Sequence, residues 1–309
     1  MATLSSEAAV VAQPRPLRLP RLRIKEGTAF GWLMVALPLA FLIAFVGYPF
    51  VYGIWLSLEN RAVARPAVFI GLGNFIADAR DPVFWQVVRN TFVYTIVATI
   101  LKAAGGLALA LVMNQNFRHK DLARAIMLLP FIVPTVLSTI AWMWILDPAF
   151  SPLNWLLVHL GVAPPGPSWL GNRYLAMGSV ICINTWRGLP FYAITLLAGL
   201  QTIPGDLYDA ATIDGAGSWH RFRYVTLPLL QPVLLIVTMF SVIFTFADFQ
   251  LVYVLTRGGP ANATHLFATY SFDIAMSAGQ LGHGASVALA MVPALALVIV
   301  ALTLYMRRQ

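Results

Sequence analysis

The amino-acid sequence predicts an all-α polytopic membrane protein with six transmembrane helices. Of its 309 residues, 59% are apolar and only 10% are charged, whereas a soluble domain averages about 45–50% apolar and about 25% charged residues. So few charges cannot cover a surface that faces water, which indicates lipid as the solvent. Six stretches reach the roughly 20 apolar residues that a helix needs to cross a bilayer. None alternates as a membrane barrel does, so backbone groups in lipid must find their partners within helices.

The predicted spans follow one another through a transmembrane domain of residues 30–306. Their ranges are Phe30–Leu58, Thr91–Met113, Ala125–Leu146, Tyr174–Leu200, Leu229–Leu255 and Ala285–Met306. A basic tail, residues 1–29, precedes them, and residues 307–309 form a stub after them. The first apolar stretch has 29 residues and no obvious cleavage site. A signal peptide carries about 7–15 apolar residues, so we expect this stretch to be retained as a span.

Lysine and arginine residues are distributed unevenly between the two sides of these spans. Twelve of the 20 lie in the N-terminal tail, residues 114–124, residues 201–228 and the C-terminal stub, and six lie in the segments on the other side. Basic residues accumulate on the cytoplasmic side of membrane proteins, so both termini are predicted to be cytoplasmic. Because these residues occupy short segments between apolar runs, the net charge of +8 does not indicate a nucleic-acid partner.

The segment between the fourth and fifth spans, residues 203–228, is long and lies on the predicted cytoplasmic side. Pro204 followed by Asp206 is typical of a helix start, with Asp206 as a possible N-cap. Leu207–Ile213 has a helical pattern, and Gly215 can end that helix in a left-handed conformation. Two interpretations remain open on composition alone. The segment is an amphipathic loop on the lipid headgroups, or a short helix that docks on a cytoplasmic partner.

The same segment resembles the signature of the permease subunits of bacterial ABC importers, which is a Glu-Ala-Ala triplet, a later glycine and a Leu-Pro pair. The matching residues are Asp209-Ala210-Ala211, Gly215 and Val225-Thr226-Leu227-Pro228, with aspartate in place of the family's glutamate. The resemblance extends from about Phe30 to Arg308 and is closest to carbohydrate permeases of the maltose and glycerol-phosphate types. Leu255-Thr-Arg-Gly-Gly-Pro260 resembles the first of the two permeases in such systems, which indicates a first-type subunit.

This resemblance implies the type I permease fold of ABC importers and a subunit that is not itself an enzyme. It implies that residues 203–228 carry a coupling helix for an ATPase, formed by Asp209, Ala210, Ala211, Asp214, Gly215 and Pro228. The implied partners are a second permease, two ATPase subunits, an extracytoplasmic sugar-binding protein and the lipid bilayer. ATP and Mg would be bound by the ATPase and no cofactor by this chain. The implied location is the bacterial cytoplasmic (inner) membrane.

Polar residues gather in two predicted spans, where they are costly and therefore indicate function. One cluster is Asn184-Thr-Trp-Arg-Gly-Leu-Pro-Phe191, and the other lies between Ser241 and Asp248. Both align with the substrate-contacting stretches of the maltose permease. The resemblance therefore implies a set of pathway residues: Asn184, Arg187, Gly188, Phe191, Ser241, Phe244, Thr245 and Asp248. Three of them, Arg187, Thr245 and Asp248, depart from the maltose pattern, so maltose itself is not assigned.

Charged residues within the spans allow other interpretations. Arg187 and Asp248 could pair with each other, or with the partner permease, and only hold helices together. Lys102, in the middle of the second span, could snorkel, pair with a carboxylate of a partner subunit, or flank the pathway.

Other functional classes find less support in the sequence. None of the three lysines lies in a phosphate-binding loop, so this chain is not expected to be the ATPase. The histidines show no metal-ligand spacing, and Gly282-His-Gly284 predicts a bend. A transporter driven by an ion gradient would usually carry acidic residues within its spans, where Asp248 is the main one. A membrane-embedded enzyme would need paired catalytic groups, but Asp206, Asp209 and Asp214 already have places in the predicted helix and in the motif.

Overall fold

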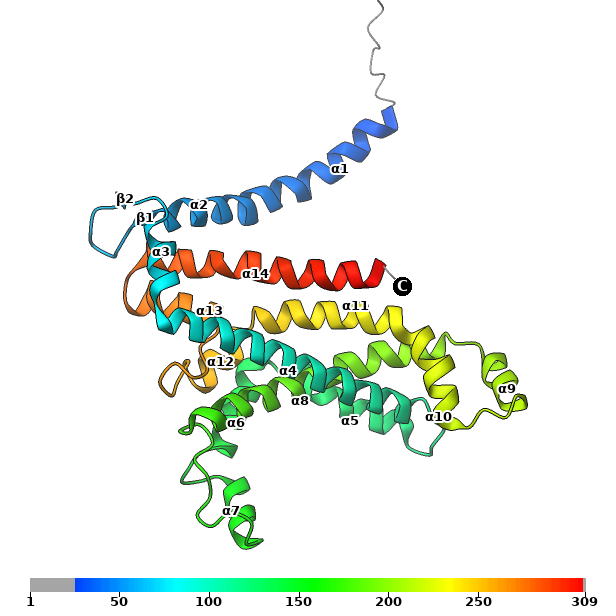
Figure 1. Cartoon of the computed structure of the whole chain (residues 1–309). Helices are drawn as coiled ribbons and strands as arrows, with labels where there is room; N and C mark the ends of the chain where they lie inside the picture. The colour runs from blue at the N-terminus through cyan, green and yellow to red at the C-terminus, as the bar shows by residue number, and fades with distance from the viewer. Residues whose placement is uncertain (1–25, 308–309) are drawn as a thin grey trace, which may run out of the picture. The chain divides into compact units, whose positions relative to one another are not determined.

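The computed structural model describes residues 26–307, most of which are helical (Figure 1). Within that range, five helices are long and apolar enough to cross a membrane, and the count reaches six if one bent pair forms a single span. The predicted all-α polytopic fold class is confirmed. The parts of the predicted tail and stub at residues 1–25 and 308–309 lie outside the described residues.

The first of two compact units covers residues 1–51, and its described part is helical. The elements are α1 (Glu26–Leu42), the π-helical turn η1 (Ile43–Gly47) and α2 (Tyr48–Ser57), which continues into the second unit. Residues 31–57 form one apolar helix of spanning length, and the predicted first span falls on it. In the π turn, backbone hydrogen bonds join residues five apart instead of four. The turn lies within this helix and does not end it.

The second unit, residues 52–309, starts with a small hairpin and a helix. These elements are β1 (Glu59–Asn60), β2 (Val68–Phe69) and α3 (Gly73–Arg80). The two strands are antiparallel, with Glu59 opposite Phe69. The buried Asn74 side chain donates hydrogen bonds to the backbone oxygens of Ser57 and Glu59, at 2.8 and 2.9 Å. These bonds tie α3 to the end of α2 and to the hairpin.

Two long helices form the centre of the second unit. They are α4 (Pro82–Met113) and α8 (Arg173–Gln201), and they pack lengthwise against each other (Figure 1). Each starts at a side-chain cap, since Asp81 accepts from the Val83 N–H at 2.8 Å and Asn172 accepts from the Tyr174 N–H at 2.9 Å. Because the cap sets the start of the helix, α4 begins before the predicted range that opens at Thr91.

The predicted third span, Ala125–Leu146, is broken in the structure. It consists of α5 (Lys120–Ile132) and α6 (Thr135–Ile145), which meet at an angle of 93°. Pro134 has no N–H to donate, and a residue before proline favours an extended backbone. Val133 accordingly has ψ of 129°. A further short helix, α7 (Pro152–His159), lies in the connection to α8.

The predicted fifth span, Leu229–Leu255, is displaced along the chain. The helical elements here are α9 (Gly205–Ile213), α10 (Ser218–Arg221), the π-helical turn η2 (Phe222–Thr226), α11 (Leu227–Phe246) and α12 (Gln250–Leu255). The long helix runs over Ser218–Phe246 and stops before Asp248. Hydropathy marks where lipid begins, whereas a helix can continue into polar sequence, so the prediction started this helix too late. It also missed the break at residues 247–249.

The last elements are α13 (Phe267–Phe272), the π-helical turn η3 (Asp273–Ser277) and α14 (Leu281–Arg307). The predicted bend at Gly282-His-Gly284 is wrong, because these residues form the first turn of α14. The His283 side chain reaches across to α3, where its Nε2 lies 2.7 Å from Asp78 Oδ1. The two glycines beside His283 therefore allow close packing at the start of α14 and do not form a turn.

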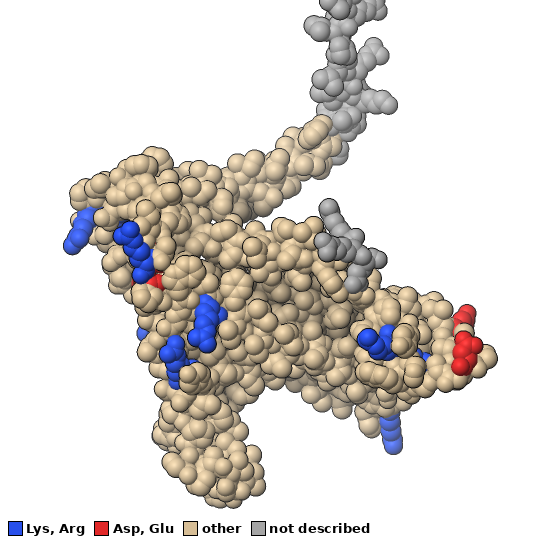
Figure 2. Space-filling model, in the orientation of Figure 1, with Lys and Arg blue, Asp and Glu red and all other residues tan. Residues whose placement is uncertain are grey.

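Buried apolar side chains form three clusters along α4. One joins Tyr94 and Ala98 to the first half of α8 and to α12, and a second joins Ala110 and Met113 to the second half of α8 and the start of α11. The third surrounds Phe84 near α13 and α14. On the face seen in Figure 2, charged side chains lie toward the two ends of the second unit. Buried polar residues of α4, α8 and α11, among them Lys102, Asn184 and Thr245, lie between the first two clusters.

Candidate functional site

A cavity of about 520 Å³ lies between α4, α5, α6, α8 and the break after α11. All eight residues predicted to line a pathway surround it: Asn184, Arg187, Gly188, Phe191, Ser241, Phe244, Thr245 and Asp248. The structure thus brings together two polar clusters that are separate in the sequence. Small-molecule sites usually occupy about 300–1,000 Å³, so the cavity is large enough for a small solute.

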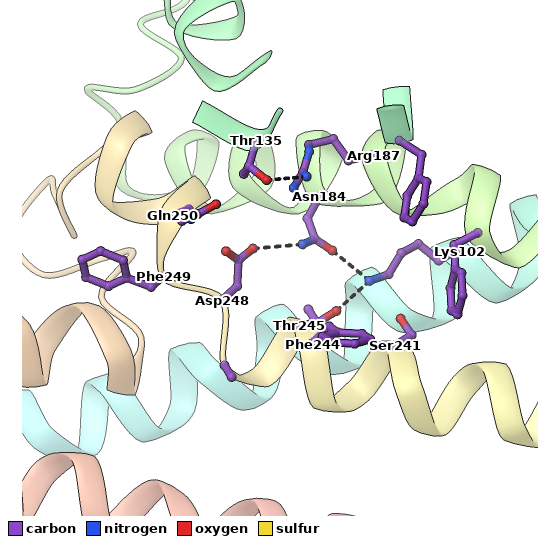
Figure 3. Close-up of a pocket in the computed structure, with 14 residues that line it drawn as sticks. Lys102, Thr135, Asn184, Arg187, Ser241, Phe244, Thr245, Asp248, Phe249 and Gln250 are labelled. Atoms are coloured by element: carbon purple, nitrogen blue, oxygen red, sulfur yellow. Dashed lines mark hydrogen bonds between the residues drawn. The ribbon is translucent and has the colours of Figure 1, made fainter. Parts of the chain in front are cut away.

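A chain of hydrogen bonds connects three helices across this cavity (Figure 3). Lys102 Nζ donates to Asn184 Oδ1 at 2.9 Å and to Thr245 Oγ1 at 2.7 Å. Asn184 Nδ2 in turn donates to Asp248 Oδ2 at 3.1 Å, and Tyr94 donates to the same oxygen at 2.6 Å. The cationic Lys102 and the anionic Asp248 are thereby joined through a single amide. This arrangement compensates charges that would be expensive to bury alone.

Arg187 does not pair with Asp248 within the described residues. Its guanidinium donates to Thr135 Oγ1 at 2.6 Å, and its Nε has no hydrogen-bond partner there. Asp248 is held instead by Tyr94, by Asn184 and by the Leu251 N–H at 3.3 Å. The interpretation of these two residues as an ion pair with each other is therefore wrong, and pairing of either with another subunit stays open.

Aromatic rings form the apolar walls of the cavity. Phe131 of α5 stacks on Phe191 of α8 with ring centroids 6.1 Å apart. Phe244 stacks on Phe240 at 6.4 Å and is itself 69% exposed. Flat apolar faces beside a few fixed hydrogen-bonding groups are what a hydroxyl-rich ring needs, because its C–H face packs on the aromatic ring while its hydroxyls bind the polar groups.

Five lining residues were not predicted: Phe131, Thr135, Ala247, Phe249 and Gln250. Lys102 also lines the cavity, which agrees with one of the three interpretations left open for it. Lys102 did carry a signal, since a charge in the middle of a span is costly, but its role did not follow from that. Phe131 and Thr135 carried none, because the bend between α5 and α6 brings them to the cavity. Likewise, the break after α11 places Ala247, Phe249 and Gln250.

The segment predicted to couple to a partner forms α9 and an exposed turn. Gly215 follows the helix with φ of +81°, and Ala216 N donates to Ala211 O at 2.9 Å, so the predicted left-handed helix end is confirmed. The predicted N-cap is wrong, because the cap is Pro204 and Asp206 lies in the first turn. Figure 2 shows acidic side chains at this tip.

All six predicted coupling residues lie in or beside this segment. Asp209, Ala210, Asp214, Gly215 and Pro228 are exposed, and Ala211 is half-buried. The segment is nonetheless ordered by its own contacts, since Tyr208 and Thr226 hydroxyls lie 3.0 Å apart and Arg221 donates to Thr212 Oγ1 at 3.1 Å. It therefore presents a preformed surface that no other part of the described chain covers.

No group of three or more histidine, cysteine, aspartate or glutamate side chains gathers as a metal site in the part of the chain that the structure describes. The cavity carries two cationic side chains, Lys102 and Arg187, and one carboxylate, Asp248. With the aromatic walls, these side chains can bind a solute by hydrogen bonds and by stacking.

Comparison with known families gives a match over most of the chain. The family described as "Binding-protein-dependent transport system inner membrane component" matches residues 102–308. This range includes the cavity residues of α8 and α11 and the whole of residues 203–228.

Several curated proteins are similar over nearly their full length. The trehalose/maltose transport system permease protein MalF of Thermococcus litoralis is 34% identical over 270 residues, which is 87% of this chain and 90% of that protein. The trehalose transport system permease protein SugA of Mycobacterium tuberculosis is 32% identical, covering 83% and 82%. The sulfoquinovosyl glycerol transport system permease protein SmoG of Agrobacterium fabrum is 33% identical, again covering 83% and 82%.

Among solved structures, a chain of a bacterial ABC transporter involved in the import of the acidic polysaccharide alginate has the same fold. The TM-score is 0.78 at 19% sequence identity, over 92% of this chain and 98% of that chain. A second structure of a bacterial alginate ABC transporter, in complex with an alginate pentasaccharide-bound periplasmic protein, gives a TM-score of 0.79 at 18% identity.

Proposed function

The chain belongs to the family of inner membrane components of binding-protein-dependent transport systems, and on this basis we propose that it forms half of the translocation pathway for a sugar or sugar-like solute. It is a multi-pass membrane protein and a permease subunit of an ABC importer. The observation that carries the proposal is the convergence of eight predicted pathway residues on one cavity halfway along α4 and α8.

The chemistry of the cavity supports a hydroxylated solute. Amide, hydroxyl, carboxylate, ammonium and guanidinium groups line it together with aromatic rings, and sugars use both kinds of contact. The relatives named for trehalose, maltose and sulfoquinovosyl glycerol are each about one third identical. We therefore propose a disaccharide or a glycoside of similar size as the solute, without choosing among them.

Residues 203–228 are proposed to dock on a separate ATPase subunit. The support is the exposed α9, its match to the family signature at Asp209, Ala210, Ala211 and Gly215, and the absence of a phosphate-binding loop from this sequence. In this proposal two ATPase subunits bind ATP and Mg and drive the cycle, while this chain catalyses no reaction. A second permease completes the pathway, and an extracytoplasmic binding protein delivers the solute.

The proposed orientation places both termini and residues 203–228 in the cytoplasm. It is supported by the twelve basic residues on that side against six on the other. The membrane is then the bacterial inner membrane, as the family description indicates.

The test combines assembly with transport. The tagged chain, expressed from its own gene cluster and extracted in mild detergent, should bring down a second permease and an ATPase. Reconstituted in vesicles with the cluster's binding protein, the complex should take up radiolabelled trehalose, maltose or another disaccharide in an ATP-dependent manner. Uptake by the variant Asn184→Ala/Phe244→Ala/Asp248→Ala should fall at least about tenfold, because one or two hydrogen bonds to charged groups are lost.

A matched control changes the same residue types away from the cavity. Asn116 and Phe117 are exposed on the connection from α4 to α5, and Asp121 is exposed in the first turn of α5. Their triple alanine variant should keep wild-type uptake. Unchanged uptake in the cavity variant would remove the pathway assignment. A chain that purifies alone and transports without ATP would instead favour a transporter driven by an ion gradient.

A further inference from the structure

Lys102 is a buried lysine within a helix of spanning length, and the sequence left three roles open for it. It lies in the middle of α4 and is only 4% exposed. Its ammonium makes two hydrogen bonds, to Asn184 of α8 and to Thr245 of α11, which are 82 and 143 residues away in the sequence. Lys102 therefore connects all three helices that carry the polar wall of the cavity.

Gly188 makes room for this lysine. A Cβ atom at Gly188 would lie 2.3 Å from Lys102 Cδ and 3.4 Å from its Cγ. Any side chain at residue 188 would therefore displace the middle of the lysine stem and withdraw the ammonium from its acceptors. Gly188 was predicted to line the pathway, and its close approach to Lys102 gives a second reason for a glycine at that position.

The ammonium determines how its neighbours present their hydrogen-bonding groups. Lys102 can only donate, so the oxygen of the Asn184 amide faces it and the amide nitrogen faces Asp248. Thr245 Oγ1 accepts from the same ammonium, so its own hydrogen remains to be donated elsewhere. Without Lys102, the Asn184 amide could turn over and the Thr245 hydroxyl could rotate.

We propose that Lys102 is a positioning residue of the solute site. It fixes the orientation of the Asn184 amide and the Thr245 hydroxyl, and so decides which of their remaining donors and acceptors the cavity offers to the solute, and it is accommodated by the missing side chain of Gly188. The inference rests on the proposed function, because it assumes that the solute passes this cavity. It differs from a purely structural role, in which Lys102 would only hold α4, α8 and α11 together.

The experiment uses the whole transporter in vesicles, with a panel of radiolabelled trehalose, maltose and sucrose and the cluster's own binding protein. Two rates are measured, solute uptake and ATP hydrolysis stimulated by the loaded binding protein. In Lys102→Met, which keeps the stem and removes the ammonium, uptake should fall about tenfold or more, as expected for lost hydrogen bonds to a charged group. Stimulated ATP hydrolysis should stay within about twofold, since the coupling segment is distant in the fold.

Gly188→Ala supplies a second variant that retains every charged group. It should reproduce the loss of uptake by displacing the lysine stem, and it should have no further effect in a Lys102→Ala background, where no stem remains to be displaced. Gly178→Ala is its matched control on the same helix, because a Cβ atom there meets nothing within 4 Å. Lys120→Met is the control for the lysine change, outside the cavity.

The outcomes separate the inference from the proposed function. Loss of uptake with retained stimulated ATP hydrolysis, in Lys102→Met and Gly188→Ala but not in the two controls, supports the positioning role. Equal loss of uptake, ATP hydrolysis and assembly assigns Lys102 a structural role only and overturns the inference, as does unchanged uptake. If the wild-type complex takes up none of the three disaccharides, the disaccharide assignment fails and this inference, which is tested on those solutes, fails with it.

Discussion

His265 shows at the scale of one residue how burial sets a protonation state. It lies in the connection between α12 and α13, is 5% exposed, and its Nδ1 is 3.2 Å from Thr269 Oγ1. Burial lowers the pKa of His265 below its ordinary value, and the negative charge of Asp273 only partly opposes this. The ring is therefore neutral in the folded segment at neutral pH.

This pKa shift predicts a segment that loosens in acid. When the segment opens, the pKa of His265 returns to about 6.5, so the opened form binds a proton more readily than the closed form. The closed segment is most stable above that pH and loses stability as the pH falls through about 6.5 toward the lower pKa of the closed state. Hydrogen exchange of residues 256–269, corrected for the intrinsic effect of pH, should be faster at pH 5.5 than at pH 7.5.

The control for this prediction is the pair of variants His265→Gln and His159→Gln. The first should abolish the acid-dependent part of the exchange, because no titrating group remains in the segment. The second removes an exposed histidine of α7 and should leave it in place. Acid-dependent exchange that persists in His265→Gln would show that another group is responsible.

At the scale of one element, α9 depends on how its end is formed. Gly215 has φ of +81°, in the left-handed region, whereas Gly217 has φ of −65°. A Cβ atom at either glycine meets nothing within 4 Å, so the two positions differ in backbone conformation and not in space. The turn after α9 therefore requires glycine at residue 215 only.

The prediction for this element concerns binding of the ATPase. Gly215→Ala forces a residue with a Cβ atom into a left-handed conformation, at a cost of about 1–2 kcal/mol. If docking needs this turn, affinity for the ATPase should fall roughly tenfold. Gly217→Ala should bind as the wild type does. Titration of the purified ATPase onto each membrane-embedded variant measures the difference, and equal affinities would show that the turn is not part of the docking surface.

At the scale of the whole second unit, α8 connects two segments that the proposed topology puts on opposite sides of the membrane. It has 29 residues, with the α7 connection before it and α9 after it, and a helix of that length extends about 44 Å. That length exceeds the roughly 30 Å hydrocarbon core of a bilayer. In the proposed orientation, which rests on the distribution of basic residues, α9 lies in the cytoplasm and α7 outside.

Cysteine labelling tests this orientation. In a Cys182→Ser background, Ser168→Cys lies in the α7 connection and Asp206→Cys lies in α9, and both positions are exposed. A maleimide that cannot cross membranes should label Ser168→Cys in intact cells, and Asp206→Cys only after the membrane is opened. The reversed result would invert the topology and remove residues 203–228 from the side where ATP is available.

The coarse architecture could be read from the sequence because the membrane acts on each stretch of chain separately. A run of apolar residues has to be a helix in lipid whatever its neighbours are. Helix ends and breaks are not decided in this way. The cap at Asp81, the extended residue before Pro134 and the break at Asp248 each depend on local bonds that hydropathy does not measure.

The sequence by itself determined the class of the protein, the helical segment within residues 203–228 and, through resemblance, eight of the fourteen residues that surround the cavity. Only the tertiary structure decided which polar side chains meet. It joined Lys102 to Asn184 and Thr245 and separated Arg187 from Asp248. The physical reason is that solvation by lipid depends on composition along the chain, whereas a hydrogen bond depends on the packing of α4, α8 and α11 to within a fraction of an ångström.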